Sequence, residues 1–317
     1  MAFFCFVMSQ IPPYLSTGDK VAVIATAKKI DRQSLEYSIK VLKSWGLIPL
    51  EGQYLYNSYF QYAGTDEERI TDLQWALSNP EIKAIFCARG GYGTTRILDK
   101  ANLESLKKYP KWLIGYSDIT SLHFSFQASD YSSIHGPMPV NFSKNVQYGS
   151  MDKLKEILFG QLKSSIHIPA DPQNKTGTGK GPIIGGNLTL IYNMIGTKTD
   201  MDFSGKILFI EEVGEYLYHI DRVMTHLKRA GKLTNLQGLI VGHFSDIKDN
   251  EEPFGNSWKD IILDAVKDYC FPVAFNFPAG HEDHNDPIIL GTEAILAVNM
   301  DKCELDYRSL YSTSRTV

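Results

Sequence analysis

Residues 112–120 read Trp-Leu-Ile-Gly-Tyr-Ser-Asp-Ile-Thr, an apolar run that becomes polar at Ser117. Such a run is typical of a strand buried in a parallel sheet, and the polar residues after it favour a sharp turn into a helix. A serine at that turn projects its hydroxyl beside the free N–H groups of the helix, which can stabilise an oxyanion. Taken alone, a serine here is more often a helix N-cap. The stretch also matches the hydrolase motif G-x-S-x-G only in part, since Ile119 replaces the second glycine.

Strand and helix signals alternate on both sides of this stretch through the first 140 residues. Short apolar runs predict strands, and apolar residues spaced three or four apart predict helices. The expected strands are residues 20–26, 82–87 and 112–116, and the expected helices lie around residues 35–42, from Thr65 to residue 78, over residues 94–106 and from Ser117 onward. The helix from Thr65 opens with a capping box to Glu68. This rhythm predicts an α/β fold built on an open parallel sheet.

The length of 317 residues suggests two domains. Residues 141–182 are rich in polar residues, lysine and glycine, and residues 174–181 are typical of a loop. We therefore expect an α/β nucleophile domain over residues 1–140, a connector over residues 141–182 and a smaller, strand-rich C-terminal domain over residues 183–317. The expected elements after residue 140 are helices near residues 151–159, 218–230 and 258–268 and strands at residues 207–210, 239–241, 273–275 and 294–298.

Composition excludes several classes of partner. The formal net charge is 32 − 36 = −4, which argues against nucleic acid as the main partner. Four cysteines lie far apart and form no Cys-x-x-Cys pair, so nothing requires an oxidising compartment. The first eight residues are apolar but lack a basic region and are too short to span a bilayer. We expect a cytoplasmic protein without a membrane partner.

A glycine-rich loop, Arg-Gly-Gly-Tyr-Gly at residues 89–93, follows the strand expected at residues 82–87. Ligands bind beyond the carboxyl ends of strands in open α/β sheets, and glycines let the backbone present N–H groups to an anion. A tight strand-to-helix turn explains the glycines equally well. The spacing matches neither G-x-G-x-x-G nor G-x-x-x-x-G-K-[ST], so neither a nucleotide nor another cofactor is expected.

A nucleophilic serine needs a base, and the base needs an orienting group. Glu211 and Glu212 end an apolar run, where alternation along a strand lets only one of them point into a given cleft. His281 lies in a loop rich in glycine and asparagine, with His284 three residues later. The order serine, glutamate, histidine is the one that α/β-hydrolases use.

Taken together, five segments resemble the LD-carboxypeptidase family, which comprises muramoyl-tetrapeptide carboxypeptidases and the related microcin-C immunity peptidases. These segments are Arg-Gly-Gly-Tyr-Gly at residues 89–93, Gly-Tyr-Ser-Asp-Ile-Thr at 115–120, Glu-Glu-Val-Gly-Glu at 211–215, Ile-Asp-Arg at 220–222 and Gly-His at 280–281. The resemblance runs from about residue 18 to residue 290. It implies an N-terminal domain similar to class I glutamine amidotransferases, a smaller strand-rich C-terminal domain and a homodimer.

The resemblance also implies roles for individual residues. Ser117 would be the nucleophile, Glu211 the orienting carboxylate and His281 the base. The oxyanion would be held by the backbone N–H groups of Asp118 and of Gly91 in the glycine loop.

The substrate implied by the resemblance is a murein tetrapeptide, cut between an L-centre and the terminal D-Ala. A microcin-like acyl-sulfamoyl adenylate is the alternative substrate. Arg89, Gly90 and Tyr92 would contact the substrate, and a guanidinium at Arg89 suits the terminal carboxylate. An ion pair that only braces the loop is the other interpretation of Arg89.

Some residues depart from the family pattern. Residues 25–27 read Ala-Thr-Ala where the family usually has a proline and a serine, and Glu212 stands where an aspartate is common. The choice between Glu211 and Glu212 therefore stays open, as does the choice between His281 and His284, with the first of each pair preferred.

Two other classes of function remain. His281, Asp283, His284 and His243 could form a metal site of a metal-dependent hydrolase, although the chain has no H-E-x-x-H motif. A small-ligand-binding protein could instead use the glycine loop as its anion site. In such a protein Ser117 would only cap a helix, with no imidazole within reach.

Overall fold

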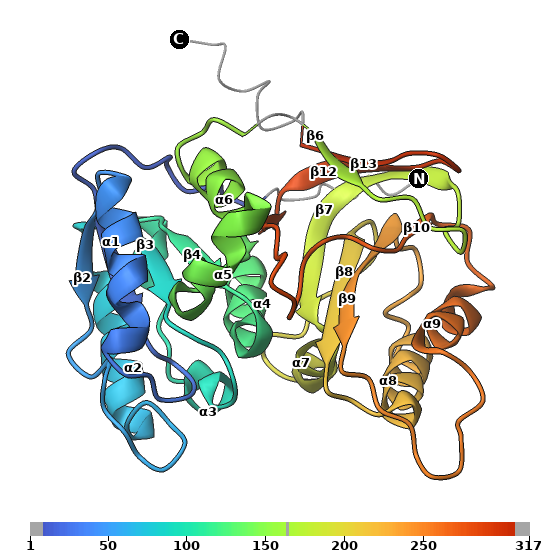
Figure 1. The fold of residues 1–317 in the computed structure, drawn as a ribbon, viewed down its shortest axis with the longest axis horizontal. Coiled ribbons are helices and arrows are strands. Elements are labelled where there is room, and N and C mark those ends of the chain that lie inside the picture. The colour runs from blue at the N-terminus through green and yellow to red at the C-terminus, as the bar shows by residue number, and fades with distance from the viewer. Residues whose placement is uncertain (1–8, 163–164, 308–317) are drawn as a thin grey trace.

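The computed structural model describes residues 9–162 and 165–307. The apolar first eight residues, Cys5 among them, lie outside the described residues. The molecule has two halves that lie side by side, and each half consists of one sheet with its helices (Figure 1). No helix in the described ranges is long and apolar enough to cross a membrane.

The first sheet has six strands in the order β11-β5-β4-β3-β1-β2. Its strands are β1 (Lys20–Ile24), β2 (Ile48–Glu51), β3 (Ile82–Cys87), β4 (Trp112–Gly115), β5 (Ser133–His135) and β11 (Ile288–Leu290). The five strands from the N-terminal half pair in parallel, which confirms the predicted parallel sheet. Strand β11 is antiparallel to β5 and comes from the far end of the chain.

Helices cover both faces of the first sheet (Figure 1). They are α1 (Glu36–Ser44), α2 (Asp66–Ser78), α3 (Thr94–Leu98), α4 (Thr120–Ala128), α5 (Phe142–Asn145) and α6 (Ser150–Leu158). Alternate residues of β1 divide between the faces: Val21 and Val23 join the cluster with α1, whereas Ala22 and Ile24 join the cluster with α2. Burial on both faces explains why the strands are continuous apolar runs.

The predicted helix over residues 94–106 is wrong in its length. Helix α3 ends at Leu98, and a separate 3-10 turn covers Glu104–Lys107. Asn102 interrupts the helix, because its side chain accepts from the N–H of Glu104 and its own N–H donates to Gln74. Such local side-chain bonds compete with the helical pattern.

The second sheet has seven strands in the order β10-β9-β8-β7-β12-β13-β6. Its strands are β6 (Ser165–Ile168), β7 (Gly177–Asn187), β8 (Ile207–Val213), β9 (Gly238–Ser245), β10 (Val273–Ala274), β12 (Glu293–Val298) and β13 (Cys303–Asp306). Helices α7 (Leu188–Met194), α8 (Leu217–Arg229) and α9 (Trp258–Val266) accompany it. Strand β6 comes from the expected connector, and β11 returns to the first sheet, so the two sheets do not divide the chain at a single point.

The prediction of a loop over residues 174–181 is wrong, because β7 begins at Gly177. Its glycines permit close backbone crossings that no other residue allows. A Cβ atom at Gly179 would lie 1.6 Å from the carbonyl oxygen of Gln237, and one at Gly181 would lie 2.2 Å from that of Gly205. Composition indicated a loop here, but close packing required the glycines in a strand.

Helix α4 joins the two halves of the molecule. It follows the 3-10 turn Ser117–Ile119 and packs against both β5 of the first sheet and β7 of the second. The backbone N–H of Asn187 in β7 donates to the Thr120 hydroxyl in α4 over 3.0 Å. In the same region of β7, Asn187 pairs in register with Glu211 of β8. The residues expected to do chemistry thus lie at one joint between the two sheets, the contact of α4 with β7.

We predict that Gly179→Ala lowers the free energy of unfolding by about 1–3 kcal/mol, because the added methyl group meets a backbone carbonyl that cannot move freely. Thr178→Ala, at an exposed position of the same strand, should change it by less than about 0.5 kcal/mol. Urea unfolding of both variants measures the difference. Equal effects would contradict the close crossing as the reason for the glycine.

Candidate active site

Ser117 lies at the turn between β4 and α4. Its φ angle is +64°, a left-handed conformation that costs a non-glycine residue on the order of 1–3 kcal/mol. The 3-10 turn that begins at Ser117 has Tyr116 at its N-cap and no side-chain capping bond. The simple N-cap interpretation of Ser117 is therefore wrong. Its Oγ lies 3.0 Å from Nε2 of His281 instead, although 164 residues separate the two.

His281 also reaches Glu211 with its other ring nitrogen. The distance from Nδ1 to Oε2 of Glu211 is 2.7 Å. A carboxylate only accepts hydrogen bonds, so Nδ1 carries the proton and Nε2 is left to accept from the Ser117 hydroxyl. Glu211 lies in the buried part of β8 and has no exposed surface. The three side chains form one hydrogen-bonded chain that can move a proton away from Ser117.

Burial and charge act in opposite directions on His281. Desolvation lowers its pKa, but the charge of Glu211 and the hydrogen bond to it raise the pKa, and the net shift is upward. The imidazolium is therefore stabilised relative to one in water. A base that is to hold a proton taken from a hydroxyl needs this stabilisation.

The loop that carries His281 is fixed from several sides. Gly280 has φ +135°, and a Cβ atom there would lie 3.0 Å from Cβ of His243 and 3.1 Å from Oε2 of Glu211. Its N–H donates to the buried side chain of Asn285 over 3.0 Å. On the outer side, the Asn145 amide donates to the carbonyl of Asp283 over 2.7 Å. Glycine at position 280 lets the histidine approach the carboxylate closely.

Glu212 is occupied elsewhere. Its carboxylate accepts from the Asn187 side chain at 2.8 Å and from both the N–H and the hydroxyl of Thr189 at 2.9 and 2.7 Å. Burial raises the pKa of Glu212, the charge of Glu211 raises it further, and these hydrogen bonds oppose the rise. Glu212 therefore anchors the start of α7, and Glu211 is the carboxylate that contacts the imidazole.

His284 and His243, which the rival metal site would share with His281, do not join the hydrogen-bonded chain of Ser117, His281 and Glu211. The His284 ring stacks on Tyr148 with centroids 5.2 Å apart, and its Nε2 lies 3.3 Å from Asp286. His243 faces Glu282 at 3.8 Å. Among residues 9–162 and 165–307, no three or more His, Cys, Asp or Glu side chains form a group suited to a metal ion.

The glycine loop lies against Ser117. A Cβ atom at Gly90 would be 2.9 Å from Cβ of Ser117 and 3.1 Å from its Oγ, so only glycine fits. Gly91 has φ +118° and packs under the stem of Lys28. Tyr92 is half exposed, 6.1 Å from the ring of Tyr62. The loop therefore places its backbone beside the Ser117 hydroxyl.

The two remaining predicted site residues have defined contacts. Arg89 donates from Nη1 to the carbonyl of Lys29 over 3.0 Å. In the described part of the chain it forms no ion pair, so the bracing carboxylate considered for it is absent there. The Asp118 side chain is buried and accepts from the N–H of Thr94 over 2.8 Å, which leaves its backbone at the turn beside Ser117.

Sequence reasoning missed several residues that support the site. Tyr116 packs edge-on against the His281 ring with centroids 5.0 Å apart, and its hydroxyl accepts from Asn141. Asn285 holds Gly280, as described above. The available signal for Tyr116 was its place in the segment 115–120, and for Asn285 its place directly after His284 in the loop rich in glycine and asparagine.

Comparison with known proteins agrees with this geometry. Residues 21–136 match the N-terminal domain of LD-carboxypeptidases, and residues 180–296 match their C-terminal domain. A probable murein peptide carboxypeptidase of Bacillus subtilis is 32% identical over 298 residues, which cover 92% of this chain and 92% of that protein. The chain belongs to the LD-carboxypeptidase family. It is therefore a carboxypeptidase, a hydrolase of peptide bonds.

A further relative and two solved structures extend the comparison. The murein tetrapeptide carboxypeptidase of Pseudomonas aeruginosa is 29% identical over 291 residues, covering 88% of this chain and 94% of that protein. The crystal structure of muramoyltetrapeptide carboxypeptidase from Oxalobacter formigenes superimposes with a TM-score of 0.81 at 28% identity, covering 90% and 98% of the two chains. The microcin C7 self immunity protein MccF, in complex with aspartyl sulfamoyl adenosine, has a TM-score of 0.82 at 18% identity over 94% and 98% of the chains, and so shares the fold.

The hydrogen bond between Glu211 and His281 predicts a shift in the pH profile. An imidazole acts as a base only when it is neutral. A reaction that uses His281 as its base should therefore show kcat/KM falling as the pH drops through a pKa above the ordinary 6.5 of histidine. Glu211→Gln removes the charge that raises this pKa. We expect the acidic limb to move to lower pH and kcat to fall by up to about 10⁴-fold.

Glu212→Gln is the matched control. It should lower thermal stability by loosening α7. It should move the acidic limb down much less than Glu211→Gln does, because the charge of Glu212 raises the pKa of His281 without a hydrogen bond to the ring. If Glu212→Gln moved the limb and Glu211→Gln did not, the assignment of the two carboxylates would be reversed.

Proposed function

We propose that this LD-carboxypeptidase is a serine peptidase that releases the terminal D-Ala of murein tetrapeptide by cleaving an L–D peptide bond. The observation that best supports this proposal is the hydrogen-bonded chain from Ser117 through His281 to Glu211. The substrate class comes from the names of two relatives, the probable murein peptide carboxypeptidase of Bacillus subtilis and the murein tetrapeptide carboxypeptidase of Pseudomonas aeruginosa.

The proposed reaction is acyl transfer in two steps. The Ser117 hydroxyl attacks the scissile carbonyl while His281 takes its proton, and the buried charge of Glu211 stabilises the imidazolium. The backbone N–H groups of Asp118 and Gly91 hold the oxyanion. His281 then protonates the leaving amine, D-Ala departs, and water hydrolyses the ester on Ser117 with His281 again as base.

Recognition of the chain end would fall to Arg89, with Gly90 and Tyr92 beside it. The Arg89 guanidinium uses one nitrogen on the carbonyl of Lys29 and pairs with no carboxylate in the described residues. A guanidinium held by a backbone carbonyl keeps donors for a substrate carboxylate. The loop position next to Ser117 sets the distance between that carboxylate and the scissile bond.

The cellular setting and assembly are part of the proposal. Cys87, Cys270 and Cys303 are free thiols, as is usual in a reducing compartment, which supports a cytoplasmic enzyme. A homodimer is proposed from the resemblance to the family. Light scattering on the purified protein measures the assembly directly.

We predict that Ser117→Ala keeps the fold and loses activity by about 10⁶-fold, as for other serine nucleophiles. Mass spectrometry after incubation with a murein tetrapeptide should show loss of one alanine with the native enzyme. An all-L tetrapeptide should stay intact. Turnover of the alanine variant above a tenth of native would contradict the nucleophile.

The same assay separates the microcin-like alternative. Cleavage of an aminoacyl-sulfamoyl adenosine with no cleavage of the tetrapeptide would move the substrate to that class. The Ser117 assignment would survive that result, because both reactions attack a carbonyl.

Arg89→Lys should raise KM for the free-acid tetrapeptide by about 10-fold or more and leave KM for its C-terminal amide little changed. The reason is the loss of two-point contact with the carboxylate. Thermal melting of the variant provides the control. Equal losses on both peptides would return Arg89 to a bracing role.

A further inference from the structure

A buried arginine on α2 lies behind the glycine loop. No part of the Arg69 side chain is exposed. It shares a helix face with Leu73 and Leu77, where the helical pattern predicts an apolar residue. A guanidinium is costly to bury unless partners bind it. Its presence at a core position therefore indicates a specific task.

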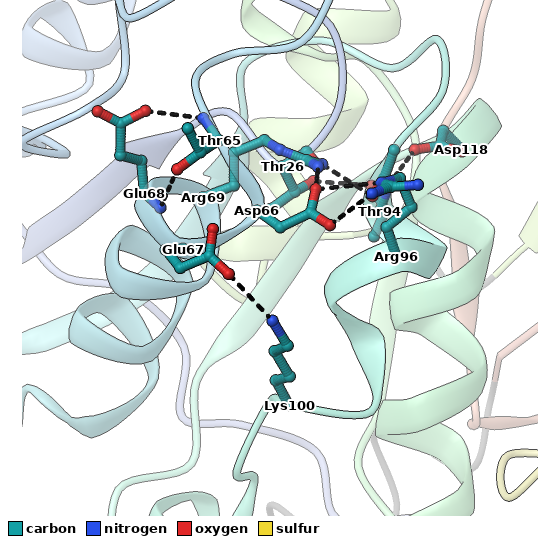
Figure 2. Close-up of polar contacts among 11 residues, drawn as sticks. Thr26, Thr65, Asp66, Glu67, Glu68, Arg69, Thr94, Arg96, Lys100 and Asp118 are labelled. Carbon is teal, nitrogen blue, oxygen red and sulfur yellow. Dashed lines mark hydrogen bonds and ion pairs between the residues drawn. The ribbon is translucent and has the colours of Figure 1, made fainter. Parts of the chain in front are cut away.

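The guanidinium bridges two backbone segments (Figure 2). Its Nη1 donates to the carbonyl of Thr26 over 2.5 Å and to the carbonyl of Gly93 over 2.8 Å. Its Nη2 pairs with Asp66, which Arg96 also binds from the surface. Thr26 follows β1, and Gly93 ends the glycine loop. One nitrogen thus ties the loop to the end of the neighbouring strand.

The same contacts continue to the Ser117 turn. Thr94 follows Gly93, and its N–H donates to Oδ2 of Asp118 over 2.8 Å. The Thr94 hydroxyl lies 2.9 Å from the hydroxyl of Thr26 (Figure 2). Asp118 is the residue directly after Ser117. A shift of Gly93 would therefore displace both the glycine loop and Asp118, which lie on either side of the Ser117 hydroxyl.

The glycine loop needs such an anchor. Gly91 and Gly93 adopt φ of +118° and +141°, and glycine alone supplies little conformational preference of its own. Backbone donors stabilise an oxyanion only when they are fixed before the reaction. A Cβ atom at Gly93 would lie 2.6 Å from Nη1 of Arg69, so the guanidinium lies directly against the loop backbone.

We propose that Arg69 is a positioning residue for the oxyanion site. Through the carbonyl of Gly93 it fixes the peptide planes of the glycine loop, and through Thr94 it fixes Asp118. It does not touch the substrate. The inference rests on the proposed function only in assigning the N–H groups of Gly91 and Asp118 to the oxyanion.

The test uses labelling of Ser117 by an alkyl fluorophosphonate, followed by intact-mass spectrometry. In this reaction Oγ forms a bond to phosphorus, fluoride leaves, and the hydroxyl proton passes to His281. The phosphoryl oxygen occupies the oxyanion site, so the rate reports on that site without a peptide substrate. The variants are Arg69→Met, Arg69→Lys and the control Lys100→Met. Lys100 pairs with Glu67 of α2 over 3.4 Å but touches no carbonyl of the loop (Figure 2).

We expect Arg69→Met to label about 10²-fold more slowly than the native protein, a loss typical of an active site misplaced by about 1 Å. Arg69→Lys, which can reach one carbonyl but not both, should fall in between. On the murein tetrapeptide the loss should appear in kcat with KM nearly unchanged. Lys100→Met should label at the native rate.

Circular dichroism melting gives the folded fraction, and rates are compared per folded molecule below the lowest melting temperature. If Arg69→Met does not fold, the comparison rests on Arg69→Lys. Native labelling by the folded Arg69 variants, or equal slowing by Lys100→Met, would overturn the proposal. Slow labelling of the Arg69 variants with no cleavage of the tetrapeptide by the native enzyme would retain the proposal and reject the substrate. Absence of label on Ser117 in the native enzyme would reject both.

Discussion

The candidate site depends on one joint between the two sheets. Ser117 follows β4 of the first sheet, whereas Glu211 lies in β8 of the second, so their separation is set where α4 meets β7. There the N–H of Asn187 donates to the Thr120 hydroxyl, and a Cβ atom at Gly186 would lie only 2.5 Å from that oxygen. Thr120 lies close to Ser117 in sequence, and Asn187 pairs in register with Glu211. Gly186 permits the close approach of β7 to α4, and the hydrogen bond between Asn187 and Thr120 fixes how the two elements meet.

The chemistry at the joint explains several features that are unfavourable for folding. Glu211 is fully buried, and its Oε1 has no hydrogen-bond partner among the described residues. A buried carboxylate is costly, and the contact of its other oxygen with His281 offsets part of that cost. The left-handed backbone at Ser117 adds strain at the same place. Such local costs are found where function, rather than stability, selects the conformation.

Much of the fold and the site can be predicted from the sequence because the relevant signals are local. The apolar runs gave the parallel strands, Thr65 and Glu68 marked the start of α2, and the motifs around Ser117 carried the family resemblance. What could not be predicted depends on contacts between distant segments. The glycines near Gly179 resemble a loop until the crossing with Gln237 is known. Arg69 looks like a surface residue of a helix until the carbonyls that bind it are placed.

The most direct test of Ser117 as the nucleophile is to quench native enzyme with acid within milliseconds of mixing with substrate and to map the modified peptide by mass spectrometry. A nucleophilic Ser117 should carry an acyl group equal to the substrate without its terminal residue. An acyl group on another side chain, or a single turnover of product with no acylated protein at any time point, would contradict it.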